Sequence, residues 1–142
     1  MTRSGSARTL AAWLALALGV NVAGCGLNVQ APDLFMLTRT GQGQRLTLLV
    51  NDAGTISCNG GHSKQLPDPL LLQARDLATS LGSDAKAKLR IAPTADSVFS
   101  FAIKLQAGTI SFPDTAASSH QELAAAELFA VQAAQGPCGL GS

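Results

Sequence analysis

The chain has 142 residues, of which 46% are hydrophobic and only 13% are charged, and its formal net charge is +1. That length accommodates one domain and a targeting segment. A near-neutral chain without a basic cluster argues against nucleic acid as a partner. Aromatic side chains on which bases would stack are also scarce, because there is no Tyr and the single Trp, Trp13, lies near the N-terminus.

The N-terminus has the order of regions typical of a secretory signal. Residues 1–8 carry Arg3 and Arg8 and no acid, and residues 10–20 form an apolar run that small residues and Cys25 follow. A membrane-spanning helix needs about 20 apolar residues. The apolar run is much shorter than that, so a cleaved signal peptide is the favoured interpretation over a membrane anchor.

The four residues Val22-Ala23-Gly24-Cys25 resemble the lipobox of bacterial lipoproteins. The resemblance implies that the thiol of Cys25 receives a diacylglyceryl group and that a signal peptidase cuts between Gly24 and Cys25. Each buried acyl methylene contributes about 0.8 kcal/mol, so two chains anchor a protein stably. We therefore expect an exported protein held by its lipid at the outer face of a bacterial membrane.

This interpretation divides the chain into four parts. Residues 1–24 are the removed signal peptide, 25–33 a lipidated tether, 34–138 a single domain and 139–142 a C-terminal tail. From Cys25 onward the chain contains four Arg, four Lys and nine Asp and Glu, so the net charge of the mature part is −1. A tether of nine extended residues spans at most about 30 Å, which keeps the domain close to the membrane.

The chain contains three cysteines, an odd number for an exported protein. Assigning Cys25 to the lipid leaves Cys58 and Cys138, which an oxidising compartment allows to pair. Such a bond would contribute about 4 kcal/mol by restricting the unfolded chain. Two free thiols are one alternative, and a zinc site with His62 and His120 is another, although zinc ligands usually show tighter paired spacing.

Two apolar, β-prone runs follow the tether, at residues 34–39 and 46–51. The segment 40–44 between them, TGQGQ, is typical of a hairpin turn, because it lacks the length and the lysine of a phosphate loop. A second turn around Gly54 leads into a third strand at Thr55–Cys58. Glycine supplies the positive φ that such tight turns need.

Asp68 followed by Pro69 predicts the start of a helix, with Asp68 as the N-cap. The helix is expected to run to about Leu81, after which Gly82 ends it. The apolar residues that recur at helical spacing on one face are Leu70, Ala74, Leu77, Ala78 and Leu81.

Residues 83–97 are small and polar and carry Lys86, Lys88 and Arg90 at alternate positions. Two interpretations fit, an edge strand through residues 89–91 or an irregular crossing loop. The alternating cations would guard a solvated strand edge, as lysine commonly does. Alternatively, they would meet an acidic partner or anionic lipid headgroups.

The C-terminal third predicts a hairpin and a helix. Residues 98–105 and 109–112 are the two strands of the hairpin, and Ser119-His120-Gln121-Glu122 matches a capping box at the start of the helix. The apolar stripe expected on this helix contains Ala124, Leu128 and Val131, with Leu123 beside them.

The sequence AGTIS occurs twice, at residues 53–57 and 107–111, each time after an apolar strand and before a helix. Chance or shared hairpin chemistry explains the repeat, and so does duplication of a hairpin–helix unit. Either way the order ββ(β)α-ββα predicts an α+β fold, with two helices packed on one face of an antiparallel sheet of four to five strands.

No catalytic constellation stands out in the sequence. The only histidines are His62, in a glycine-rich loop, and His120, near a helix start, and no nucleophile signature surrounds a serine. No acidic run has the spacing of a calcium loop. We therefore expect no enzyme activity, no catalytic residue, no metal and no cofactor.

The segments LTRTGQGQRLTLLVNDAGTISCNGG and GTISFPDTA are similar to a group of small predicted lipoproteins from actinobacteria, over most of residues 25–142. That likeness implies no mechanism. The element order also resembles that of emfourin-type metalloprotease inhibitors, from whose Arg-Ser-Gly-Gly hairpin residues 39–43 depart. We expect a membrane-anchored, non-catalytic domain that binds an envelope protein or ligand. Inhibition of a secreted metalloprotease is the alternative.

Overall fold

The computed structural model describes residue 29 and residues 32–141 of the chain. The strands are β1 (Asp33–Gly41), β2 (Gln44–Asn51), β3 (Thr55–Cys58), β4 (Lys64–Gln65), β5 (Ser100–Leu105) and β6 (Gly108–Pro113). The helices are α1 (Asp68–Ser80), α2 (Gly82–Lys86) and α3 (Gln121–Gln135), and a 3-10 turn, η1 (Asp114–Ser118), precedes α3.

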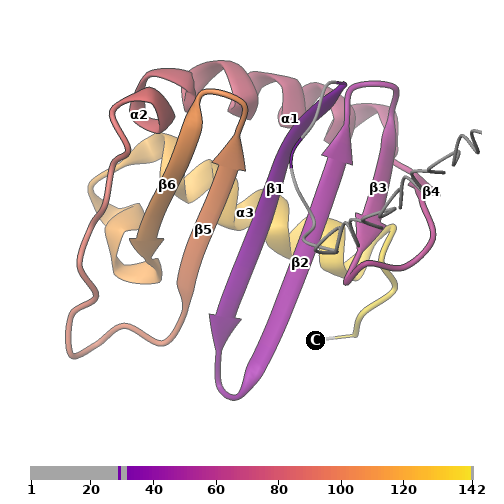
Figure 1. The fold of residues 1–142 in the computed structure, drawn as a ribbon. Coiled ribbons are helices and arrows are strands. Elements are labelled where there is room, and N and C mark those ends of the chain that lie inside the picture. The colour runs from indigo at the N-terminus through magenta and orange to yellow at the C-terminus, as the bar shows by residue number, and fades with distance from the viewer. Residues whose placement is uncertain (1–28, 30–31, 142) are drawn as a thin grey trace, which may run out of the picture.

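The six strands form one antiparallel sheet in the order β4-β3-β2-β1-β5-β6. Helices α1 and α3 lie across one face of this sheet, and Figure 1 looks onto the opposite face. The α+β class and the helices on one face are confirmed. The sheet has one strand more than the expected four to five, because the two-residue β4 is added at its edge.

The predicted hairpin turns are confirmed. Gln42 and Gly43 both have positive φ angles, 52° and 72°, as the two central residues of a type I′ turn require. Asn51 pairs with Thr55 across a three-residue loop in which Gly54 has a φ of 91°. The turns thus bring β1, β2 and β3 together as a meander, from local sequence alone.

The two copies of AGTIS form equivalent parts of the sheet. Their isoleucines, Ile56 in β3 and Ile110 in β6, are both fully buried. β3 and β6 lie outside β2 and β5, which flank the central β1 on its two sides. The loops differ, since three residues separate β2 from β3 and two separate β5 from β6. Both explanations of the repeat therefore stay open.

Helix α1 has the expected extent but a different N-terminus. Pro67 is the N-cap residue and Asp68 is already helical, with no side-chain capping hydrogen bond, so the assignment of Asp68 as N-cap is wrong. The acid still lies in the first turn, where the helix dipole favours it. Ala74 and Leu77 are buried against the sheet as expected.

Helix α3 differs more from the prediction. It begins at Gln121 with His120 as N-cap and no side-chain cap, so the capping box is wrong. No residue of the expected stripe is fully buried, since Leu128 is 53% and Val131 is 40% exposed, and only the adjacent Leu123 is in the core. The buried face contains Leu123, Ala126, Phe129, Ala130, Ala133 and Ala134.

Aromatic packing accounts for the orientation of α3. The ring of Phe129 packs edge-on against that of Phe35 in the central strand, with centroids 5.5 Å apart. A buried aromatic pair is stabilised by the large apolar area that it removes from water and by the edge-to-face geometry of its rings. The helix therefore presents its small alanines to the sheet and leaves Leu128 and Val131 on its outer side.

The segment after α1 is neither a regular strand nor wholly irregular. Helix α2 occupies residues 82–86, which the sequence did not predict, and the chain then runs beside β6. Arg90 forms an isolated bridge with Ser111, in which the Ile91 amide donates to the Ser111 carbonyl oxygen at 2.9 Å. The crossing-loop interpretation is thus the better one, with a single point of contact at the sheet edge.

Candidate functional site

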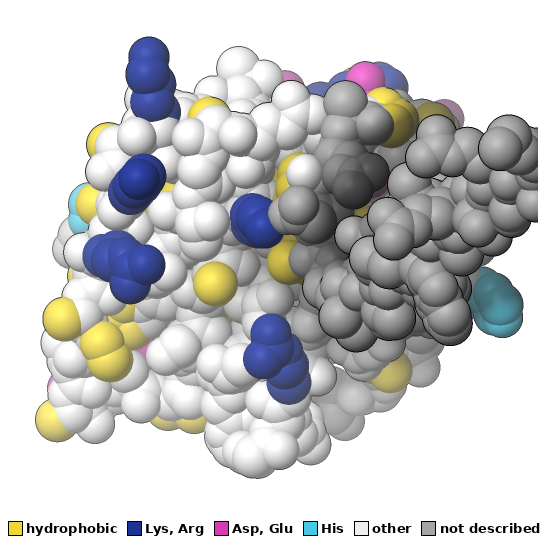
Figure 2. Space-filling view, viewed as in Figure 1, with side chains coloured by type: hydrophobic (Ala, Val, Ile, Leu, Met, Phe, Trp, Pro, Cys, Tyr) yellow, Lys and Arg dark blue, Asp and Glu magenta, His cyan; other side chains and the backbone are white. Residues whose placement is uncertain are grey.

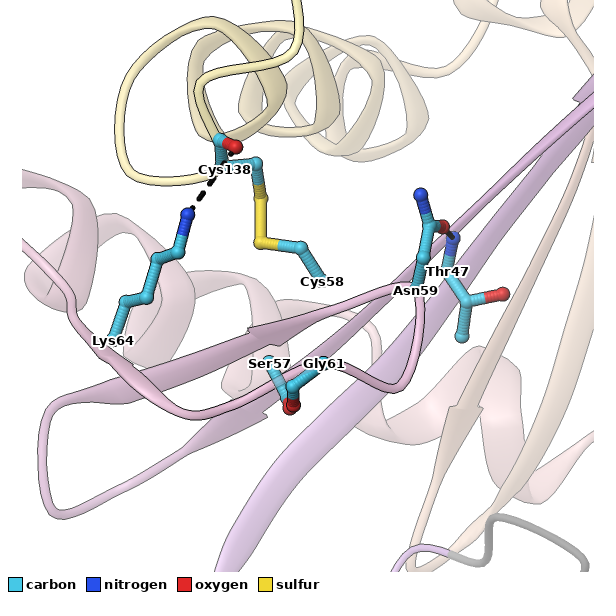
Figure 3. The surroundings of a disulfide bond; sticks show 7 residues. All are labelled: Thr47, Ser57, Cys58, Asn59, Gly61, Lys64 and Cys138. Carbon is cyan, nitrogen blue, oxygen red and sulfur yellow. Dashed lines mark hydrogen bonds between the residues drawn. A yellow bond between two sulfur atoms is a disulfide. The ribbon is translucent and has the colours of Figure 1, made fainter.

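The C-terminal segment is covalently attached to the sheet. Cys58 at the end of β3 forms a disulfide with Cys138, 80 residues later, with Cα atoms 5.8 Å apart. Figure 3 shows the bond spanning from the sheet to the segment after α3, beside Lys64. The Nζ of Lys64 donates to the carbonyl oxygen of Cys138 at 3.4 Å. The predicted Cys58–Cys138 pair is therefore present.

The disulfide argues against the zinc site considered as an alternative from the sequence. Sulfur atoms joined in a disulfide are not thiolate ligands. Within residues 29 and 32–141 there is no group of three or more His, Cys, Asp or Glu side chains that could hold a metal ion. The cysteine spacing is thus explained by the disulfide.

The chain after α3 folds back over the end of the helix. The Cys138 amide donates to Ala133 O at 3.0 Å, and the Leu140 amide donates to Ala134 O at 2.8 Å. Gly139 between them has a φ of 63°, a conformation that glycine adopts without strain. The disulfide and these hydrogen bonds together fix residues 138–141 as a wall.

A pocket of about 660 Å³ opens between this wall and the sheet. It is lined by the end of the β1–β2 hairpin, by Asn59 and Phe99, by the last turns of α3 and by residues 139–141. Its volume is in the range of pockets that bind small molecules. We call this space the hairpin-end pocket.

The hairpin-end pocket combines apolar surface with positive charge. Leu46, Phe99, Val131 and Leu140 contribute apolar side chains to its lining. The guanidinium carbon of Arg39 lies 5.0 Å from the centroid of the Phe99 ring. Arg45 is a second cationic lining residue, and none of the lining residues is acidic.

Stacking on an aromatic ring leaves the edge of a guanidinium available to an anion. The Arg39–Phe99 contact holds a cation beside apolar surface, where an anionic group gains more from it than in open water. The chemistry of the pocket therefore suits a molecule with one acidic group and an apolar body.

Asn59 lines the hairpin-end pocket next to the disulfide, and hydrogen bonds to β2 hold it in place. Its backbone amide donates to Thr47 O at 2.7 Å, and its side-chain oxygen accepts the Thr47 amide at 2.8 Å. Figure 3 shows Asn59 directed toward Thr47, away from Cys58. This double contact allows Asn59 to hold a φ of 51°, which asparagine tolerates better than most residues.

A separate acidic pair lies where η1 meets α3. The Oε1 atom of Glu127 is buried and, among the described residues, has no hydrogen-bond partner. Burial, and then the charge of Asp114, raise the pKa of Glu127 to about 7. The Asp114 carboxylate instead accepts the backbone amides of Val98 and Phe99, at 3.2 and 3.1 Å. Asp114 thus connects the start of η1 to the segment that leads into β5.

The other candidate residues from the sequence lie elsewhere. His62 is exposed, and Nδ1 of His120 is 3.6 Å from Oε1 of Glu122. Neither histidine lines the hairpin-end pocket. Gly24 and Cys25, the expected cleavage and lipidation site, lie outside the described residues. None of the helices in the described part of the chain is long and apolar enough to cross a membrane.

Sequence reasoning missed the hairpin-end pocket because its residues come from five separate segments. The one available signal was the surplus of large apolar residues on the last helix, more than one face can bury. Val131 was assigned to the core, yet it lines the pocket. Comparison with models of protein families, with curated proteins and with solved structures finds no match.

Proposed function

We propose that this protein is an exported lipoprotein whose α+β domain is a non-catalytic binding module, held by a lipid on Cys25 at the outer face of a bacterial membrane. We further propose that the hairpin-end pocket takes an anionic amphiphile, a molecule with a carboxylate or phosphate attached to an apolar chain. The observation that carries the binding proposal is Arg39 stacked on Phe99 in a pocket without acidic lining residues.

The anchor is supported by the sequence around Cys25, and the fold is compatible with it. The central strand β1 begins at Asp33, so few residues separate it from Cys25. A lipid on Cys25 would hold the domain near the membrane, with its pocket at the far end of β1, beside Gly41.

Metabolic labelling tests the anchor. Cells grown with a clickable palmitate analogue should label the wild-type chain, and Cys25→Ala should abolish the label. Cys58→Ala is the matched control, because it changes a cysteine outside the lipobox and should retain the label. Label on the Cys25→Ala chain would contradict the anchor.

Paired probes test the pocket. Laurate and dodecylamine have an apolar chain in common and differ in the sign of their charge. Calorimetric titration of an exported Cys25→Ser chain with each therefore separates the contribution of the apolar chain from that of the charged group. We expect laurate to bind at least about tenfold more tightly, a difference of about 1.4 kcal/mol. Equal affinities would rule out recognition of the anion, and no binding of either would rule out an amphiphile pocket.

Two arginine variants localise the binding. Arg39→Gln should weaken laurate about tenfold, because a charge-assisted contact is lost. Arg75→Gln makes the same charge change at a site where Nε of Arg75 contacts Oδ1 of Asp52 at 2.7 Å, outside the pocket lining. It should leave laurate affinity unchanged, and an equal loss in both variants would point to net charge alone.

Inhibition of a secreted metalloprotease is a second proposal. It is supported by the observed order of elements, in which strands and a helix precede a hairpin and a second helix. Assay of the exported Cys25→Ser chain against a panel of secreted metalloproteases tests it, and inhibition of none would remove its support.

A further inference from the structure

The charges of this protein are unevenly distributed along the chain. Residues 82–111 carry four cations and two acids, a net charge of +2, whereas the rest of the chain from Cys25 carries four cations and seven acids, a net charge of −3. The cations of the positive segment are Lys86, Lys88, Arg90 and Lys104, which we call the basic patch. Its acids are Asp84 and Asp96.

The fold places Lys104 on the side of the sheet that α1 and α3 leave uncovered, and the other three cations beside the β6 edge of that sheet. In β5 the buried Phe101, Ile103 and Leu105 face the helices, so Lys104 between them lies on the opposite face. Lys86, Lys88 and Arg90 are exposed beside β6, where Arg90 bridges Ser111. Lys104 of β5 pairs with Thr109 of the neighbouring strand β6.

Figure 2 shows the result on the surface. Lys and Arg side chains are spread over the sheet face and along its β6 edge, and only small parts of Asp and Glu side chains are visible, near the rim. Hydroxyl groups lie among the cations, because Thr109 and Ser111 alternate in β6 with the buried Ile110 and Phe112. Cations with interspersed hydroxyls suit phosphate groups.

We infer that this face of the sheet docks on an anionic phospholipid bilayer, so that the anchored domain lies with its helices away from the membrane. The inference rests on the proposed lipid anchor, because a tether of at most about 30 Å holds the domain near the headgroups. Separate lysines on a broad face, not a closed pocket, match the fluid and repeated phosphates of a bilayer.

Each cation close to an anionic membrane surface favours the docked orientation about fivefold. The four cations of the basic patch together are sufficient to make one orientation dominate, since the anchor already supplies the membrane attachment. The exposed acids of α1, Asp68 and Asp76, contribute in the same direction, because an anionic surface repels the helical side. High salt weakens the docking, since charges separated by more than a Debye length are screened.

Lysine reactivity in vesicles tests the inference. The mature protein, purified in detergent from cells that express the full chain, is reconstituted into vesicles of phosphatidylcholine, and into vesicles with equal amounts of phosphatidylcholine and phosphatidylglycerol. Acetylation of each lysine is then followed by mass spectrometry. Lys86 and Lys88 should react at least about threefold more slowly in the anionic vesicles, and high salt should remove the difference.

Lys64 is the internal control, because its ammonium group is directed toward Cys138 on the helical side (Figure 3). Its reactivity should be the same in both vesicles. Arg90→Gln combined with Lys104→Gln should reduce the protection of Lys86 and Lys88, whereas Arg75→Gln should not. Equal rates at Lys86 and Lys88 in the two vesicles, or equal protection of Lys64, would overturn the docking.

The same experiment separates the two proposals. A protein that washes off both kinds of vesicle has no lipid anchor, and the proposed function fails. A protein retained by both without selective protection is anchored but not docked, and only the further inference fails.

Discussion

Gly108, at the start of β6, lies against the backbone of Ala85 in α2. A Cβ atom on Gly108 would stand 2.0 Å from the carbonyl oxygen of Ala85, a separation that no side chain can adopt. Ala85 is itself fully buried. The short helix α2, which follows α1 directly, is thereby packed onto the β5–β6 hairpin, and this contact sets where the basic patch lies.

Gly108→Ala should lower the free energy of unfolding by at least about 2 kcal/mol, because the hairpin or α2 must move to make room. Thermal unfolding of both proteins measures the loss. Gly82→Ala is the matched control, since nothing lies within 4 Å of a Cβ at that helical position. It should be neutral or stabilise by about 0.5 kcal/mol, and an equal loss in both variants would contradict the close packing.

Removal of the disulfide should affect both stability and binding. The double variant Cys58→Ala and Cys138→Ala should lose about 2–5 kcal/mol of unfolding free energy. It should also bind laurate more weakly, because the segment that carries Leu140 loses its attachment to β3. Reduction of the wild-type protein provides an independent comparison. If the double variant kept the wild-type laurate affinity, the pocket wall would not depend on the bond.

The carboxyl group of Glu127 should make stability depend on pH. Its pKa is about 7 in the folded protein against 4.5 in the unfolded chain, so the folded state holds the proton more firmly. Stability from this group is therefore fully present below pH 4.5 and is lost as the pH rises to about 7. We expect a loss of about 1 kcal/mol, since solvent screening reduces the effect of a partly exposed group.

Glu127→Gln should remove this loss, which melting curves at acidic and mildly alkaline pH would show. Asp76→Asn removes a carboxylate from the exposed side of α1 and should keep the wild-type pH dependence. An unchanged slope in the Glu127→Gln protein would mean that another group titrates.

Lys88 holds a left-handed conformation at the end of α2, with a φ of 56°. The amide that follows it, that of Leu89, donates to Asp84 O at 3.0 Å, a closing bond typical of a helix C-terminus. Lys88→Gly should therefore stabilise the domain by about 1 kcal/mol, the strain that a side chain adds in this conformation. Lys88→Gln removes the charge but keeps the strain, so only the glycine variant should raise the melting temperature.

The strands were largely predictable because their turns are local. TGQGQ and NDAG each contain glycine where the structure has a positive φ, and the alternation within β2 places Leu46, Leu48 and Val50 in the core. Turn chemistry acts over four or five residues, and the sequence contains all of it. The two-residue β4 and the five-residue α2 were not predicted. Segments this short do not show a repeating pattern of apolar residues.

The last helix shows where sequence reasoning ends. Its residues are apolar on most sides, so hydrophobic spacing selected a face containing Leu128 and Val131, and that face is the exposed one. The contact between Phe129 and Phe35 joins residues 94 positions apart and decides the orientation instead. When a helix has two apolar faces, the shape of the sheet against which it packs decides which face is buried.

The sequence by itself determined the hairpins and the α+β class and predicted the pairing of Cys58 with Cys138, because local turn geometry, hydrophobic spacing and the number of cysteines are properties of the chain. Only the tertiary structure decided which side of α3 is buried, that Arg39 lies over Phe99 in a pocket, and that Lys104 lies on the open face of the sheet with Lys86 and Lys88 beside its β6 edge. These relationships depend on packing between distant segments, and packing is fixed only when the whole core is assembled.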